Sequence, residues 1–160
     1  MTSTRLISKQ RLTALTMCLT LPILAHADRD DRIRIGNSPL YQQECAACHL
    51  AYPPALLPAQ SWERIMTNLS DHFGTDASLD VQTTQDISRW LQDNSEGHKA
   101  ARSSPPQDRI TQSRWFKHEH DEIAPDVWLR PKIKSASNCM ACHTSADRGD
   151  FDEDNVRIPR

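Results

Sequence analysis

Hydrophobic residues recur at helical spacing in the middle of the chain. Four apolar residues stand at positions i, i+3, i+4 and i+7, the spacing of one helix face: Trp62, Ile65, Met66 and Leu69. Ser61, directly before them, is of a residue type that favours the N-cap position. The pattern predicts an amphipathic helix that is capped by Ser61 and ends near Gly74.

Start signals predict two further helices. Ser38 and Pro39 suit an N-cap and a first helical position, and this helix would lead into Cys45 and Cys48. Thr83, with Asp86 at the capping-box position, predicts a helix that ends by Asn94. The buried residues expected on it are Ile87, Trp90 and Leu91.

One short helix and several irregular segments complete the pattern. The short helix, capped by Thr111 or Ser113, would hold Trp115, Phe116 and His120. Residues 52–58 are too rich in proline for regular structure, residues 95–109 have the composition of a linker, and residues 147–160 lack a helical period. Strand patterns are not evident, so the sequence predicts a mainly α fold. We expect a signal peptide (1–27), an N-terminal lobe (28–100) and a largely irregular C-terminal segment (101–160).

The first 27 residues have the order of a secretory signal peptide. A basic start precedes an apolar run from Leu12 to Leu24, and Ala25-His26-Ala27 forms a small-x-small cleavage site. The run is short for a bilayer span, so we expect an exported protein that is not embedded in a membrane. Cleavage after Ala27 removes three of the 19 Lys and Arg and none of the 21 Asp and Glu, which lowers the formal net charge from −2 to −5. This balance does not indicate nucleic-acid binding.

The four cysteines after the signal form two C-x-x-C-H motifs, the attachment signature of haem c. They are Cys45, Cys48 and His49, and Cys139, Cys142 and His143. Two thiols three positions apart can form thioethers to one porphyrin, and the adjoining histidine can then bind the iron. A Cys₄ zinc site does not explain a histidine after each pair, and a thioredoxin-like pair would need a βαβ context. Disulfides remain compatible with an exported chain. The motifs predict two covalently bound haems c.

The second axial ligand of each iron decides what the haem can do, because an open position permits gas or peroxide chemistry. Met66 is interpreted as a core residue on the apolar helix face, so histidine is the expected ligand. His72 follows an amphipathic helix, whereas His98 stands in the linker and is expected to be solvated. His118 and His120 point in different directions on a helix, and only His120 shares a face with Phe116. By sequence proximity we pair His72 with the first haem and His120 with the second.

Longer strings resemble the small bacterial periplasmic dihaem cytochromes c that reduce a monohaem, oxygen-binding c-type cytochrome. The likeness runs from about Pro39 to Arg160 and rests on these strings: Glu-Cys-x-x-Cys-His-x-Ala-Tyr-Pro-Pro, Leu-Leu-Pro-Ala-x-Ser-Trp, Asp71-His72-Phe73-Gly74, Glu119-His120 and Ser135-Ala136-x-Asn138-Cys139-x-x-Cys142-His143. The resemblance implies an N-terminal lobe similar to a class I cytochrome c and a C-terminal segment wrapped around the second haem. It also implies two bis-histidine irons, a periplasmic location, and a membrane b-type cytochrome as electron donor.

The leading functional hypothesis is an electron carrier without catalytic residues, passing electrons to a redox partner such as a monohaem c-type cytochrome. The alternative is a dihaem enzyme or gas-binding protein, peroxidase-like or a sensor, with one open iron. Arg130, Lys132 and Lys134 precede the second attachment motif. They are compatible with a docking surface for an acidic partner and equally with a solvated charged stretch.

Overall fold

The computed structural model describes residues 33–160, so the signal-peptide prediction lies outside the described residues. Four α-helices occur in this range: α1 (Pro39–Cys45), α2 (Ala59–Thr67), α3 (Val81–Asp93) and α4 (Arg114–Glu119). Short 3₁₀ helices connect them: η2 (Pro54–Leu56), η3 (Leu69–Asp71), η4 (Lys99–Arg102), η5 (Pro106–Asp108), η6 (Ile110–Gln112), η7 (Val127–Leu129), η8 (Cys139–Ala141), η9 (Ala146–Arg148) and η10 (Glu153–Asn155). The described residues contain no strand, and only one isolated bridge joins His72 to Thr75. The mainly α prediction is confirmed.

The helix caps agree with the sequence patterns in part. The Ser38 hydroxyl accepts a hydrogen bond from the amide of Tyr41 in α1, and the Ser113 hydroxyl caps α4 at Phe116. The predicted starts of α2 and α3 are wrong. Pro58 precedes α2, with Ser61 buried inside its first turn, and Asp80 rather than Thr83 caps α3 through the amides of residues 82 and 83.

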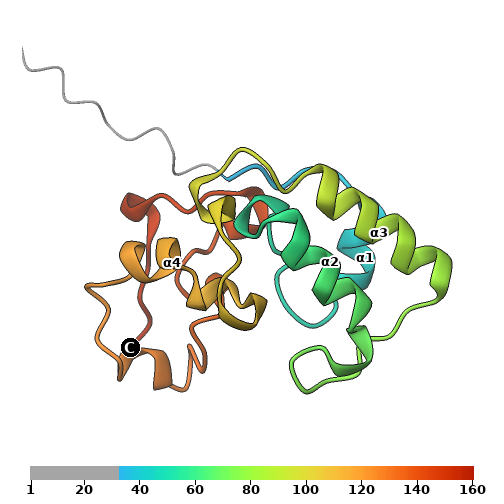
Figure 1. Ribbon diagram of the computed structural model, residues 1–160. Coiled ribbons are helices and arrows are strands. Elements are labelled where there is room, and N and C mark those ends of the chain that lie inside the picture. Colours follow the sequence, from blue (N-terminus) through green and yellow to red (C-terminus); the bar gives the residue numbers. More distant parts are fainter. Residues whose placement is uncertain (1–32) are drawn as a thin grey trace, which may run out of the picture.

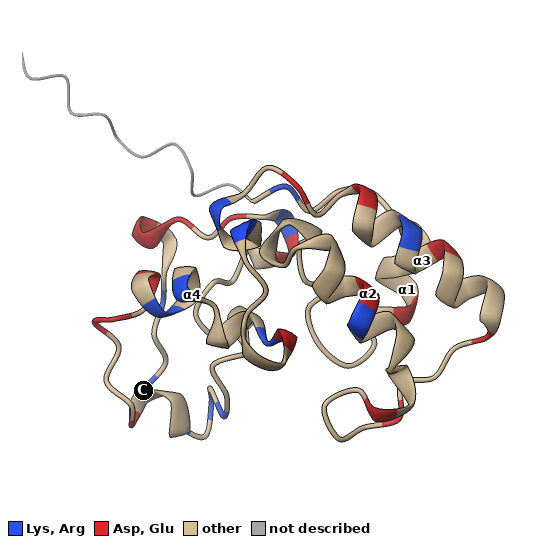
Figure 2. Ribbon diagram, in the orientation of Figure 1, with Lys and Arg blue, Asp and Glu red and all other residues tan. Residues whose placement is uncertain are grey.

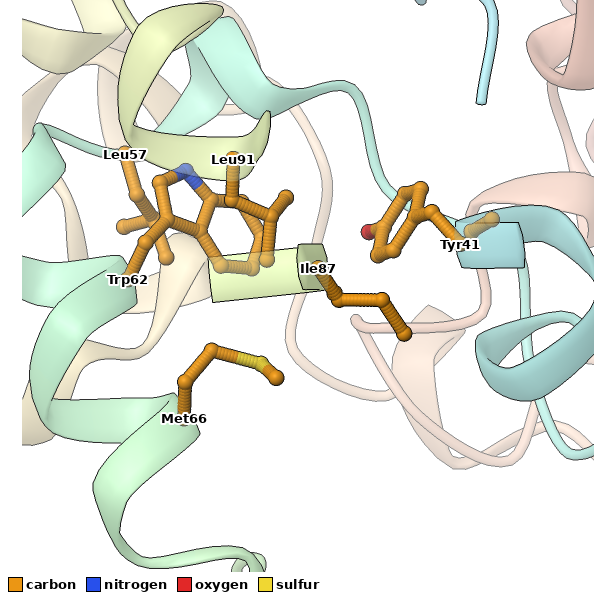
Figure 3. Close-up of a cluster of buried hydrophobic side chains, with 7 residues drawn as sticks. Tyr41, Leu57, Trp62, Met66, Ile87 and Leu91 are labelled. Carbon is orange, nitrogen blue, oxygen red and sulfur yellow. The ribbon is translucent and has the colours of Figure 1, made fainter. Parts of the chain in front are cut away.

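Helices α2 and α3 pack against each other with α1 beside them, and these three helices form the right-hand part of Figure 1. The main core lies between them and contains Tyr41, Ala51, Leu57, Trp62, Met66, Ile87 and Leu91. Figure 3 shows the labelled side chains of this set converging from α1, α2 and α3, with Leu57 coming from the end of η2. The buried indole of Trp62 donates a 2.7 Å hydrogen bond to the carbonyl of Pro54, which fixes the proline-rich segment onto α2.

The 95–109 segment is folded onto the protein, which differs from the linker expected there. Ser95 and Ala100 are buried, and Ala100 packs in a second core with Ile33, Ala55 and Leu56. Small and polar residues can lie flat against a neighbour, so composition alone did not distinguish this packed segment from a loose one. The division at residues 100 and 101 stays a prediction.

The C-terminal half forms the left-hand part of Figure 1 and consists of α4, short 3₁₀ turns and irregular chain. Ile133 and Ala146 are fully buried there. The amide of Ile33 donates to the carbonyl of Gly149, so Ile33 is held against the C-terminal half. None of the helices in the described range has the length and apolar character needed to cross a membrane.

Candidate functional site

The first attachment motif follows from the geometry of α1. The helix ends at Cys45, Cys48 lies in the exposed turn that follows, and His49 comes directly after it. Burial raises the pKa of the Cys45 thiol to about 11, with a smaller contribution from the adjacent Glu44. One thiol therefore faces the interior and the other lies at the surface, which suits attachment along one edge of a porphyrin.

The His49 ring faces His72. The two ring centroids lie 6.1 Å apart and the ring planes differ by 21°. The Nδ1–H of His49 donates a 2.6 Å hydrogen bond to the carbonyl of Leu50. Because a carbonyl can only accept, this contact assigns the proton to Nδ1 and leaves the Nε2 lone pair for a metal.

His72 is held by a tight turn. Its amide donates to the carbonyl of Thr75 and its carbonyl accepts from the Thr75 amide. Phe73 and Gly74 between them have positive φ angles of 54° and 94°. Burial, and then the neighbouring His49, lower the pKa of His72, so the ring is neutral and able to bind a metal.

The second attachment motif borders a cavity of about 660 Å³, which we call the second cavity because it lies at the second motif. The cavity is lined by Cys139, Cys142, His143 and His120 together with apolar side chains that include Leu56, Trp128, Phe151 and Val156. Its size is in the range of cofactor pockets. Phe151 and Val156 come from the C-terminal tail, which therefore closes this site.

His120 and His143 face each other across this cavity. Their ring centroids are also 6.1 Å apart, but the ring planes differ by 77°. The Nδ1–H of His120 donates a 2.9 Å hydrogen bond to the carbonyl of Phe116, whose ring stacks on His120 at 4.1 Å. Burial, and then His120, lower the pKa of His143, while Asp150 acts in the opposite direction.

These two ring pairs have the dimensions of a bis-histidine metal site. Metal–imidazole bonds in proteins are about 2 Å long, so a metal ion between two histidines holds their ring centroids about 6 Å apart. Both pairs match that separation, and in each pair one histidine has its Nδ1 proton fixed by a backbone carbonyl. The residues therefore fit two irons, each with a C-x-x-C pair beside it.

The remaining candidate ligands lie elsewhere. Met66 is buried in the main core, in agreement with its interpretation as a core residue. His118 is exposed on α4. His98 is not solvated as expected, because its ring packs edge to face on Trp115 at 5.1 Å and its Nδ1 accepts from the amide of Ala100.

The four thiols do not form the alternative sites considered for them. All are free in the structure, and none is paired in a disulfide. Across residues 33–160, no three His, Cys, Asp or Glu side chains come together as metal ligands. A Cys₄ zinc site would require such a cluster.

Tyr52 links the two attachment sites, a role that no sequence signal indicated. Its ring stacks on His49 at 4.8 Å, and its hydroxyl donates a 2.7 Å hydrogen bond to the carbonyl of Ser137, 85 residues away. Ser137 stands two residues before Cys139. Burial raises the pKa of Tyr52 to about 12, so the phenol keeps its proton at neutral pH.

Replacing Tyr52 with phenylalanine is expected to free the second attachment loop while preserving the stack on His49. The lost hydrogen bond should lower the free energy of unfolding by about 1 kcal/mol. Amide hydrogen exchange should accelerate around Ser137, as measured by NMR, and remain unchanged in α3. Unchanged protection around Ser137 would show that this hydrogen bond does not hold the loop.

Three comparisons relate this geometry to known proteins. The family model for dihaem cytochrome c matches residues 41–151. A solved diheme cytochrome c from Rhodobacter sphaeroides is 45% identical and covers 73% of this chain and 98% of its own, with a TM-score of 0.65. The diheme cytochrome type c from Shewanella baltica is 44% identical, with a TM-score of 0.67 and coverage of 76% and 92%. No curated protein sequence matches the chain significantly. The chain belongs to the dihaem cytochrome c family.

Proposed function

We propose that this protein is an exported electron carrier that holds two haems c and binds each iron between two histidines. Cys45 and Cys48 would attach the first haem, and Cys139 and Cys142 the second. His49 with His72, and His143 with His120, would be the axial ligands. The observation that carries the proposal is the common 6.1 Å separation of the two facing imidazole pairs.

The haems supply reversible one-electron chemistry at iron, and the chain controls its conditions. Two fixed imidazoles leave little to rearrange when an electron arrives. The Nδ1 hydrogen bonds of His49 and His120 hold both rings in one orientation. Because methionine raises the potential of a haem iron, bis-histidine ligation supports potentials lower than those of His/Met cytochromes c.

The location and partners in this proposal are supported by the sequence resemblance and by the N-terminal sequence. The secretory order of residues 1–27 supports a periplasmic location. A membrane b-type cytochrome would donate electrons and a small monohaem c-type cytochrome would accept them. Catalysis of bond chemistry is not part of the proposal, since both irons would be closed by strong ligands.

Spectroscopy of the purified mature protein tests the ligation directly. We expect low-spin c-type absorption spectra, oxidised and dithionite-reduced, that do not change when CO is added. Because the angle between axial imidazole planes sets the anisotropy of a ferric low-spin EPR signal, the 21° and 77° pairs should give two distinct signals. A high-spin feature, or a reduced spectrum shifted by CO, would instead favour an enzyme or gas-binding protein with one open iron.

A further inference from the structure

We propose that the surface beside the second attachment site docks an acidic redox protein. This basic face consists of Leu129, Arg130, Lys132, Lys134 and Met140. The inference rests on the proposed electron-transfer function. It adds that an acidic partner would exchange electrons with the second haem.

The segment that carries the basic face holds only positive charge, although Asp126 directly precedes it and Asp147 directly follows it. Residues 127–146 contain Arg130, Lys132 and Lys134 and no aspartate or glutamate. Lys132 and Lys134 are both exposed, whereas Ile133 between them is fully buried. Ile133 therefore anchors the segment and leaves the two ammonium groups in solvent.

Hydrogen bonds tie the lysine segment to the second attachment motif. The amides of Ile133 and Lys134 both donate to the carbonyl of Arg130, which forms a tight turn. The Asn138 side chain donates a 3.0 Å hydrogen bond to the carbonyl of Ile133, and Cys139 follows directly. The backbone that carries the charges is therefore held beside the second attachment motif, and complementary charge at such a place steers the approach of a partner.

Two apolar side chains add a hydrophobic contact. Leu129 is 79% exposed and Met140 is 37% exposed. Neither lines the second cavity, whereas Val127 and Trp128 do. The side chains of Leu129 and Met140 therefore lie outside that cavity. Apolar residues bordered by charged ones are typical of protein docking surfaces.

The first haem site has the opposite charge. Residues 37–96 contain two arginines, Arg64 and Arg89, and eight acidic residues: Glu44, Glu63, Asp71, Asp76, Asp80, Asp86, Asp93 and Glu96. Glu44 directly precedes Cys45 and Asp71 directly precedes His72. Figure 2 shows red in the part built by α1, α2 and α3, together with blue on α2 and on α3. An acidic partner would be repelled here.

The basic face also has a defined boundary. Arg130 donates a hydrogen bond to the carbonyl of Pro159, so the C-terminus lies beside it. Five carboxylates line the second cavity: Glu119, Asp121 and Glu122 at the end of α4, and Glu153 and Asp154 from the tail. These carboxylates belong to different segments from the lysines, so a partner that avoids them would approach from the side of residues 127–146.

The test uses a double charge reversal, Lys132→Glu with Lys134→Glu, in the holoprotein. Arg89→Glu with Arg102→Glu is the matched control, because it changes the net charge equally at exposed positions outside the basic face. The acidic probe is reduced plant-type ferredoxin, and the basic probe is oxidised mitochondrial cytochrome c. Stopped-flow absorbance follows electron transfer at low and high salt.

At low salt the lysine variant is expected to react with ferredoxin at least about tenfold more slowly than the wild type, because steering by opposite charge raises association rates by factors of about 10 to 1,000. High salt should remove most of this difference. The control variant should be much less affected, and the lysine variant should not react more slowly with cytochrome c. Equal losses in both variants, or no loss in either, would overturn the proposal.

Docking is also measured without electron transfer. NMR shift changes in the ¹⁵N-labelled holoprotein on adding oxidised ferredoxin should concentrate in residues 127–146. Shifts concentrated in residues 37–96, or none, would overturn the basic face. A wild-type protein that shows the expected shifts but exchanges no electrons would contradict the proposed function and leave the docking surface supported.

Discussion

Replacing His120 with alanine is expected to open one of the two irons to CO. The His120 ring lies 6.1 Å from His143 and is held by the Phe116 carbonyl, so its removal leaves an unfilled position in the second cavity. An open position at a ferrous haem permits CO binding. In the reduced variant, half of the haem should bind CO, compared with none in the wild type. A CO titration followed by absorbance measures this fraction.

His118 provides the matched control for this experiment. His118 lies in α4, two residues before His120 at the C-cap of the same helix, but the His118 side chain is exposed. His118→Ala should therefore remain inert to CO and keep a low-spin spectrum. CO binding in the His118 variant, or its absence in the His120 variant, would contradict the assignment of His120 as the axial ligand.

The first haem site should respond in the same way and independently. His72→Ala should open the iron next to His49, and the double variant with His120→Ala should bind CO at both haems. If His72→Ala left that iron closed, another side chain would be its ligand. The two single variants and the double variant therefore also test whether His72 and His120 close different irons.

The helices could be predicted from the spacing of the apolar residues that form their buried faces. The apolar face of α2 and the buried Ile87 and Leu91 of α3 are present as expected. The start of α2 was misplaced because no side chain caps it, and the start of α3 because Asp80 and Thr83 are both suitable caps. Pro58 rather than Ser61 precedes α2, and the Asp80 carboxylate, two or three residues before the amides that it binds, caps α3.

The candidate site shows the same division between local and distant information. The two motifs and the pairing of Phe116 in α4 with His120 at its C-cap are local patterns, and residue spacing alone predicted them. The packing of His98 on Trp115 and the hydrogen bond from Tyr52 to Ser137 join distant segments. Nothing in the composition near His98 or Tyr52 specifies those partners, so only the fold reveals them.

Replacing Gly149 with alanine is expected to detach Ile33 from the second haem site. Gly149 has a φ of +75°, and an added Cβ would collide with the backbone carbonyl oxygen of Ile33. Ile33 is buried, lines the second cavity and donates its amide to the Gly149 carbonyl. Backbone cannot move aside as a flexible side chain can, so the Ile33 contact should break.

Gly97→Ala is the control variant, because it introduces the same kind of backbone strain without a collision. Gly97 also has a positive φ, +98°, but an added Cβ there meets nothing within 4 Å. Its substitution should cost about 1–2 kcal/mol of strain. The Gly149 variant should lose more free energy of unfolding in denaturant, and amide exchange at Ile33 should accelerate only in that variant. Equal losses would mean that the Ile33 contact contributes nothing. A larger loss at Gly149 would show that Ile33 helps to close the second haem site, because strain is common to both variants and the Ile33 contact is not.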